Sequence, residues 1–284
     1  MIDSYKRVAA QLSTADLTNH YTQGMDYFHN SFIPRLKRKL ELLTLNNWNL
    51  DDYVGFAAGS DVDMMAHIVE AVSQKESVSL YPGDWFGFLV GSSNKENLHW
   101  TSQSSDTMAC LCVPSVRNGH ITSEMMEYLQ AAQACLLNIN LFPTLTDEER
   151  ASVAQELNTV LPKSILSVSF SRGFGMTTSQ LGVILIHKDH PFRKKYEQAW
   201  NWFSYFYNKL AADTFLDIDL GELMKVDNLR RQEVTNWLSE HNLPVVSSGT
   251  YYVKSFRVNE ELPDYLKPLQ RENVVRLCFK PQIT

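Results

Sequence analysis

Short apolar runs alternate with amphipathic stretches along most of the chain. The runs have the length and composition of buried strands, and they occupy residues 53–58, 78–81, 108–113, 135–139, 164–168 and 181–186. Other stretches carry apolar residues at helical spacing, as at Leu36, Leu40 and Leu43 within 34–45. Thr122 and Thr146 are suited to begin two further helices, the second with a capping-box signal. Strands that alternate with helices predict an α/β fold with a doubly wound, mostly parallel sheet flanked by helices.

The last third of the chain has a different pattern. One long helical pattern covers 192–215, and a second covers 221–240 and leads to a small C-terminal part. We therefore expect three parts: an N-terminal helical segment over 1–50, a large α/β domain over 51–215, and a small C-terminal domain over 216–284.

Two predicted loops have the composition of ligand-binding loops. The segment 169–182, SFSRGFGMTTSQLG, lies between two predicted core strands and is rich in Ser, Gly and Thr. Such a loop offers backbone N–H and hydroxyl groups to a ligand. Gly59 and Ser60 follow another strand pattern and precede a helical one, where free N–H groups can bind an anion. A plain strand-to-helix turn is the alternative for this second loop.

Composition narrows the class of protein. The 284 residues are 44% apolar and 20% charged, which is typical of a globular protein with a substantial core. A net charge of −6 without a basic block argues against nucleic acid as the main partner. No apolar stretch is long enough to span a membrane, and the N-terminus shows no apolar signal segment. We expect a cytoplasmic protein without membrane contact.

Cysteine and histidine spacing predicts no metal site. The four cysteines lack CxxC spacing, and Cys110 and Cys112 alternate within one run, so they should share one face of a strand. Reduced core cysteines are the simplest interpretation. His187 and His190 flank Asp189 just before a proline, a setting that favours a loop over a metal centre.

The segment 169–182 resembles the cofactor loop of the class I/II aminotransferases, the fold-type I pyridoxal-phosphate enzymes. In that family the loop carries Ser-x-Ser-Lys, a glycine-containing turn and Arg-x-Gly, and the lysine holds the cofactor as a Schiff base. Here Ser169 and Ser171 match the two serines, whereas Arg172 stands at the lysine position and Gln180 at that of a phosphate-binding arginine. The resemblance extends in family order from about residue 32 to 279, and it implies pyridoxal phosphate as the cofactor.

The resemblance implies further cofactor contacts. Gly59 and Ser60 would receive the phosphate. Trp85 would stack on the pyridine ring, unless it is an ordinary core aromatic. Asn118 would hydrogen-bond the phenolic oxygen, unless it merely forms an Asn-Gly turn. Asn138 stands where the family places an aspartate against the ring nitrogen; an asparagine can hydrogen-bond that nitrogen but cannot hold it protonated.

Arg276, within the segment 273–279, matches the family strand whose arginine binds the substrate α-carboxylate. A guanidinium between apolar strand residues needs a partner, and its fork suits a carboxylate. A buried structural salt bridge is the alternative. The resemblance further implies a small amino-acid-like ligand and a homodimer.

Three departures from the family pattern leave open whether the chain is an enzyme. The guanidinium of Arg172 stays protonated at neutral pH and has no accessible lone pair, so it cannot replace a lysine amine. Gln180 removes a charge-assisted phosphate contact of ~1.5–3 kcal/mol, and Asn138 removes the counter-ion of the ring. One hypothesis is a catalytically degenerate, aminotransferase-like pseudoenzyme that binds an amino-acid-like ligand. The other is an active transferase or lyase of amino-acid biosynthesis that uses another amine or a noncovalently held cofactor, although neither Lys163 nor Lys188 has the spacing to replace Arg172.

Overall fold

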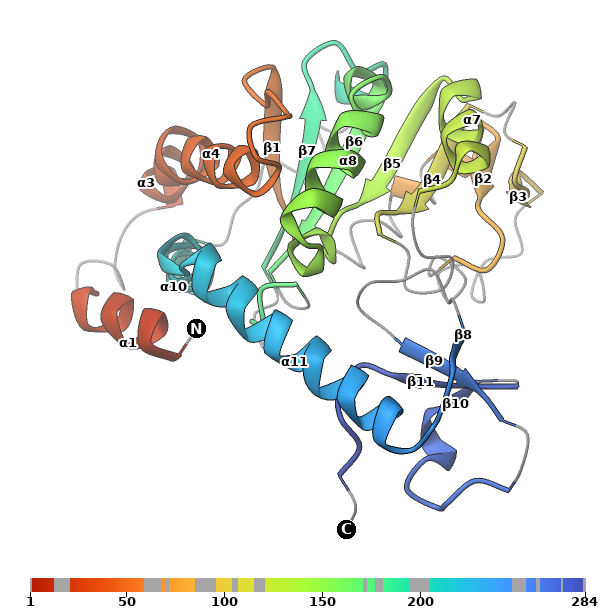
Figure 1. Cartoon of the computed structure of the whole chain (residues 1–284). Coiled ribbons are helices and arrows are strands. Elements are labelled where there is room, and N and C mark those ends of the chain that lie inside the picture. Colours follow the sequence, from red (N-terminus) through yellow and green to blue (C-terminus); the bar gives the residue numbers. More distant parts are fainter. Residues whose placement is uncertain are drawn as a thin grey trace.

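A seven-stranded sheet forms the centre of the molecule (Figure 1). The computed structural model describes residues 2–12, 21–58, 68–69, 72–84, 96–103, 107–114, 121–170, 173–176, 181–194, 205–246, 254–258, 261–271 and 273–282. The strands of the sheet are β1 (Tyr53–Ala58), β2 (Val78–Leu80), β3 (Leu98–Trp100), β4 (Met108–Cys112), β5 (Ala134–Asn138), β6 (Ser164–Ser169) and β7 (Gly182–His187).

The strand order is β1-β7-β6-β5-β4-β2-β3. Strands β3, β2, β4, β5 and β6 run parallel, and β7 is antiparallel to both of its neighbours, β6 and β1. This arrangement confirms the predicted doubly wound, mostly parallel α/β sheet. The short edge strand β3 was not among the predicted strands, because its three residues are only partly buried or exposed and carry no continuous apolar run.

Helices cover the sheet where the apolar pattern placed them. In Figure 1, α7 (Ser123–Ala131) and α8 (Asp147–Leu157) lie across one face of the sheet. The predicted caps are present: the side chain of Thr122 accepts a hydrogen bond from Met125 N, and Thr146 and Glu149 form a reciprocal capping box. The turn residues 142–144 and 161–163 form short 3₁₀ helices, η2 (Phe142–Thr144) and η3 (Leu161–Lys163).

The two faces of the sheet bury separate apolar clusters. Ala109 and Leu111 of β4 point into the larger cluster, which also contains residues of α7 and α8. Cys110 and Cys112 point into the opposite cluster with residues of β1, β2 and β7, which confirms that the two cysteines share one face. Both cysteines are buried and neither forms a disulfide, and burial holds the pKa of Cys110 well above its usual value.

N-terminal helices stand beside the β1 edge of the sheet. They are α1 (Ile2–Gln11), α3 (Tyr21–Asp26), the π-helical turn η1 (Tyr27–Phe32) and α4 (Ile33–Leu43). Helix α10 (Tyr205–Asp217) lies next to them. Lys39 of α4 joins this group to the corner after α10, since its Nζ donates to the carbonyl oxygens of Phe215, Leu216 and Ile218. Burial lowers the pKa of Lys39 to about 8, and the nearby Asp217 partly opposes that shift.

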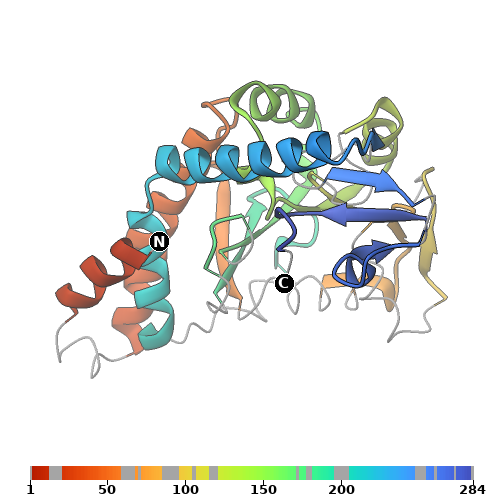
Figure 2. The ribbon, with the colours of Figure 1, turned by 60° about the horizontal axis from the view of Figure 1, so that its bottom comes forward.

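A second, antiparallel sheet follows the long helix α11 (Leu220–Glu240). Its strands are β8 (Val245–Val246), β9 (Lys254–Arg257), β10 (Gln270–Arg271) and β11 (Val274–Leu277), in the order β10-β11-β9-β8, and a 3₁₀ turn, η4 (Lys267–Leu269), precedes β10. Figure 2 shows α11 running from the helices near the N-terminus to this sheet. Trp237 and Leu238 of α11 pack on Phe256, Val275 and Leu277, so α11 lies against one face of the small sheet. The segment 247–253, SSGTYYV, which resembles a Gly-x-Phe strand of the aminotransferases, lies outside the described residues.

None of the helices within these described ranges is long and apolar enough to cross a membrane.

Candidate functional site

The strands that lead into the predicted cofactor contacts end at one edge of the large sheet. Ala58, the last residue of β1, and Ser169, the last of β6, both pair with Gly182, the first residue of β7. Cys112, which ends β4, pairs with Asn138, which ends β5. Gly59, Ser60, Trp85, Asn118, Ser171, Arg172 and Gln180 lie outside the described residues, and their assignment stays a prediction.

Asn138 and Ser169 are joined at this edge through Asn140. The Oδ1 of Asn138 accepts a hydrogen bond from Asn140 N at 3.0 Å, and the Oδ1 of Asn140 accepts one from Ser169 N. Two of the predicted contacts are therefore brought together by a third polar residue. Asn140 was not among the predicted contacts, and no local signal in the sequence sets it apart from an ordinary loop asparagine.

Asn138 keeps one donor group available. Asn138 is 7% exposed, and its Oδ1 already accepts a hydrogen bond from Asn140 N. Within the described part of the chain its amide nitrogen has no hydrogen-bond partner. The side chain therefore presents a neutral N–H donor at the carboxyl edge of the parallel strands, where ligands bind in open α/β sheets.

The loop after β6 is packed tightly against the turn after β5. A Cβ built on Gly173 would lie 2.2 Å from Asn140 O, so only glycine fits at that position. Gly175 has a φ of 74°, which also requires glycine. Phe170 and Phe174 pack on Phe215 of α10, with the Phe170 and Phe215 ring centroids 3.9 Å apart. The described residues of the loop are thus packed against the turn after β5 and against α10.

A buried carboxylate fixes the segment that leads to Trp85. Asp84 is fully buried, and its Oδ2 accepts a hydrogen bond from Cys112 N at 2.7 Å. This contact ties the turn after β2 to the end of β4, at the same edge as Asn138.

Arg276 lies on the small sheet beside Ser255. The two residues are cross-strand partners of β11 and β9, so their side chains share the face opposite the one that packs on α11. The Nε of Arg276 and the Oγ of Ser255 are both buried, and neither has a hydrogen-bond partner among the described residues. No described carboxylate lies within 4.0 Å of the Arg276 guanidinium, so the internal salt bridge considered as an alternative is not observed there.

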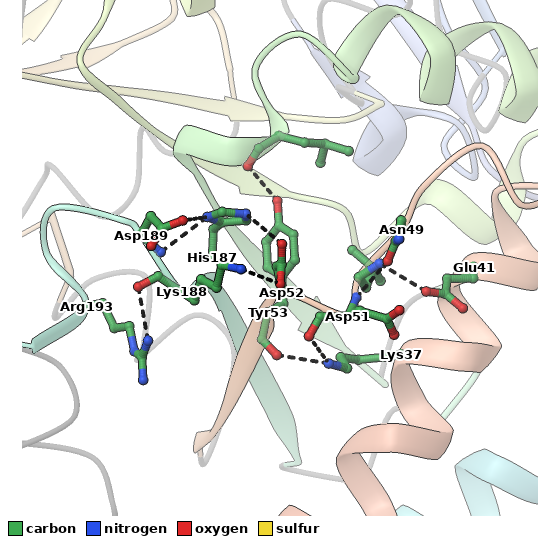
Figure 3. A network of polar contacts seen from close by, with 12 residues as sticks. Lys37, Glu41, Asn49, Asp51, Asp52, Tyr53, His187, Lys188, Asp189 and Arg193 are labelled. Carbon is green, nitrogen blue, oxygen red and sulfur yellow. Dashed lines mark hydrogen bonds and ion pairs between the residues drawn. The ribbon is translucent and has the colours of Figure 1, made fainter.

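The two lysines considered as alternative amines lie at the opposite edge of the large sheet. Lys163 immediately precedes β6, and its Nζ donates to the carbonyl oxygens of Gln130 and Ala132. Lys188 follows the antiparallel strand β7 and pairs with Asp52 at 2.8 Å (Figure 3). The length of β6, about 20 Å, separates Lys163 from Ser169.

The histidine-rich turn after β7 lies at that opposite edge as well. Figure 3 shows His187 between the carboxylates of Asp52 and Asp189, each 4.0 Å from a ring nitrogen. Asp189 is 75% exposed in its side chain, and the described residues include no cluster of three or more His, Cys, Asp or Glu side chains suited to a metal. Burial lowers the pKa of the neighbouring His190 to about 4, which keeps its ring neutral at pH 7.

Comparison with known proteins identifies the fold. No family model and no curated protein sequence matches the chain. Among solved structures, it is similar to the aspartate aminotransferase of Thermotoga maritima, with a TM-score of 0.70 at 11% identity over 99% of this chain and 84% of that one. A putative histidinol-phosphate aminotransferase from Erwinia carotovora gives 0.68 at 13% identity, over 98% and 87% of the two chains.

A third similar structure contains the cofactor. Histidinol-phosphate aminotransferase from Sinorhizobium meliloti, solved in complex with pyridoxal 5′-phosphate, gives a TM-score of 0.64 at 14% identity over 90% of this chain and 72% of that one. The chain therefore has the aminotransferase-like fold of the type I pyridoxal-phosphate proteins. At these identities the likeness defines the fold and leaves the activity to be argued from the site.

Proposed function

We propose that this protein is a catalytically degenerate, aminotransferase-like protein that binds a small amino-acid-like carboxylate through Arg276. The observation that carries the proposal is the pair of unpartnered polar groups on the small sheet, the Nε of Arg276 and the Oγ of Ser255. A buried polar group without a hydrogen bond costs about 1–3 kcal/mol. A carboxylate ligand would accept from both groups and remove that cost, and a guanidinium forms its strongest hydrogen bonds with such an anion.

Asn138 suits one atom of pyridoxal phosphate, the nitrogen of its pyridine ring. The free N–H of Asn138 suits a pyridine nitrogen that carries no proton, because an amide nitrogen can only donate to it. Bound pyridoxal phosphate would supply an electron sink for reactions at an amino-acid α-carbon. Asn138 carries no charge that would hold the ring nitrogen protonated, so it would support binding and orientation more than that chemistry.

Loss of lysine chemistry follows from the sequence and is supported by the placement of the other lysines. Arg172 cannot form an imine at neutral pH. Lys163 and Lys188 make their contacts at the edge of the sheet opposite Asn138. This placement argues against the alternative of an active transferase or lyase that borrows one of these two amines.

The covalent step has a direct test. Wild-type protein is incubated with pyridoxal phosphate, reduced with borohydride and digested, and the peptides are searched by mass spectrometry for a fixed cofactor. We expect no modified lysine in the wild type and a modified residue 172 in Arg172→Lys. Arg38→Lys, a change at an exposed position of α4, should behave as the wild type. A cofactor fixed stoichiometrically on one natural lysine would contradict the loss of the covalent step.

The carboxylate site is tested with matched ligands. A panel of L-amino acids and their carboxamides is titrated by calorimetry, and binding should require the carboxylate. Arg276→Gln should abolish that difference, whereas Arg276→Lys should retain part of it because the charge remains. Equal binding of acids and amides to the wild type would remove Arg276 from the site.

A homodimer also belongs to this proposal, by analogy with the resembled family. Sedimentation at micromolar protein should give twice the mass of the 284-residue chain, and a clean monomer would exclude it.

A further inference from the structure

Four charged side chains connect the two sheets through α11. Asp227 lies between two arginines of its own helix: its Oδ1 is 2.9 Å from Arg230 Nε, and its Oδ2 is 2.9 Å from Arg231 Nε. Arg231 also reaches α8, where its Nη1 lies 3.6 Å from Glu149 Oε2. We call Glu149, Asp227, Arg230 and Arg231 the α8–α11 clamp.

One end of the α8–α11 clamp is anchored on the large sheet. Glu149 belongs to the capping box of α8, and the same Oε2 that faces Arg231 accepts a hydrogen bond from Thr146 N at 2.7 Å. Helix α8 is followed by β6, which ends at Ser169. This end of the clamp is therefore continuous with the edge that holds Asn138 and Ser169.

The other end is anchored on the strand that carries Arg276. The Nη1 of Arg230 donates to the carbonyl oxygen of Cys278, and the Arg230 guanidinium lies 5.9 Å from the ring centroid of Phe279. Cys278 is two residues beyond Arg276, directly after β11. Arg230 therefore holds the end of β11 against α11.

The clamp is partly buried and balanced in charge. Its four side chains are 10% to 18% exposed, and its two guanidinium groups face its two carboxylates. Charge pairs that are largely shielded from water attract strongly, and removal of one member leaves its partner in an unfavourable environment. The clamp is therefore better shielded from water than exposed pairs such as Lys225–Glu222 on the same helix, whose side chains are about 70% exposed.

We propose that Arg230 is a positioning residue for Arg276: through the Cys278 carbonyl it holds the end of β11 on α11 and so fixes the place of the guanidinium that binds the carboxylate. This inference rests on the proposed carboxylate site. A displacement of about 1 Å of a ligand-binding group can weaken function by up to ~100-fold. The contact acts through the backbone of Cys278, so its effect depends on the geometry of Arg230 as well as on its charge.

The test combines two measurements on the full-length protein. Acetate is titrated as a small carboxylate probe while the Arg276 Nε–H resonance is followed by NMR. Acetamide serves as the uncharged control probe. Arg276→Lys identifies the resonance by removing it. In parallel, amide hydrogen exchange is measured for the peptide that covers 274–279.

Arg230→Gln should weaken acetate binding about tenfold and speed exchange in 274–279 at least tenfold, with exchange in β4–β6 unchanged. Arg230→Lys should show most of both effects, because one ammonium cannot reproduce the separate contacts of Nε and Nη1. Asp227→Asn, which keeps the shape of the side chain, should act in the same direction and serves if Arg230→Gln does not fold. Lys225→Gln removes an exposed charge from the same helix and should change neither measurement.

Two results would overturn the inference. Wild-type acetate affinity in Arg230→Gln would show that Arg230 does not act through Arg276, and full affinity in Arg230→Lys would show that only its charge matters. A wild-type protein whose Arg276 resonance ignores acetate would instead refute the carboxylate site of the proposed function. In that case only the hydrogen-exchange rates test whether Arg230 holds the end of β11. Unchanged rates in Arg230→Gln would refute that role as well.

Discussion

Acid should destabilise this fold through His190, which lies in the turn after β7. The side chain is 4% exposed, and its Nδ1 accepts a hydrogen bond from Phe192 N at 3.2 Å. Burial lowers its pKa to about 4, the backbone at Lys163 partly opposes the shift, and the neighbouring His187 adds slightly to it. The folded protein therefore keeps His190 neutral at a pH where a free histidine is charged.

The size of the effect follows from the two pKa values. An unfolded histidine titrates at 6.5, so between pH 6.5 and about 4 the unfolded chain binds a proton that the folded chain does not. Stability must then fall as the pH falls through this window. Since one pKa unit corresponds to about 1.4 kcal/mol, His190 alone should cost roughly 2 kcal/mol at pH 5.

The variant His190→Asn isolates this contribution. Its amide oxygen can accept from Phe192 N in place of Nδ1, but the side chain does not titrate. Urea unfolding at pH 7 and pH 5 gives the free energy of unfolding for both proteins, and the loss on acidification should be roughly 2 kcal/mol smaller in the variant. His99→Asn, at an exposed position of β3, should lose as much as the wild type. Equal losses in wild type and His190→Asn would refute the assignment.

Two further changes test the packing around the candidate site. Gly173→Ala should destabilise the fold by several kcal/mol, because the new methyl group would lie 2.2 Å from the Asn140 carbonyl oxygen. The control Gly221→Ala, near the start of α11, should stay within about 1 kcal/mol of wild type. Thermal unfolding compares the two variants, and similar melting temperatures would contradict the tight loop packing. Tyr128→Phe should lower the free energy of unfolding by about 1–3 kcal/mol, because the Tyr128 hydroxyl bridges the backbones of β2 and β4 with hydrogen bonds of 2.7 and 3.1 Å. Denaturant unfolding measures this change. A change no larger than that of Tyr5→Phe, at an exposed position, would show that the bridge contributes little.

Much of the architecture was predictable because it depends on local patterns. The strands predicted at 53–58 and 108–113 correspond to β1 and β4, and their ends differ by at most one residue. Short apolar runs of this length are typical of buried strands in an α/β fold. The caps at Thr122 and Thr146 formed as expected, because capping involves residues only three positions apart.

The candidate site was predictable only in part. Asn138 and Ser169 were identified by their order along the chain, and the structure joins them through Asn140, a link that no local signal announces. The same is true of Ser255 beside Arg276. Cross-strand pairing decides that contact, and the register of a strand cannot be inferred from its own residues.

The sequence by itself determined the α/β class, the glycine-bearing loop and the presence of arginine at position 172, because these features depend on residue identity and short-range spacing. Only the tertiary structure decided which polar groups meet. Arg230 reaches Cys278 across 48 positions, and Lys39 reaches the end of α10 across more than 170. It also placed Lys163 and Lys188 at the edge away from Asn138, since parallel and antiparallel strand directions fix which end of each strand faces the site. Contacts of this kind arise from the way the sheets and helices pack, and no periodicity along the chain encodes them.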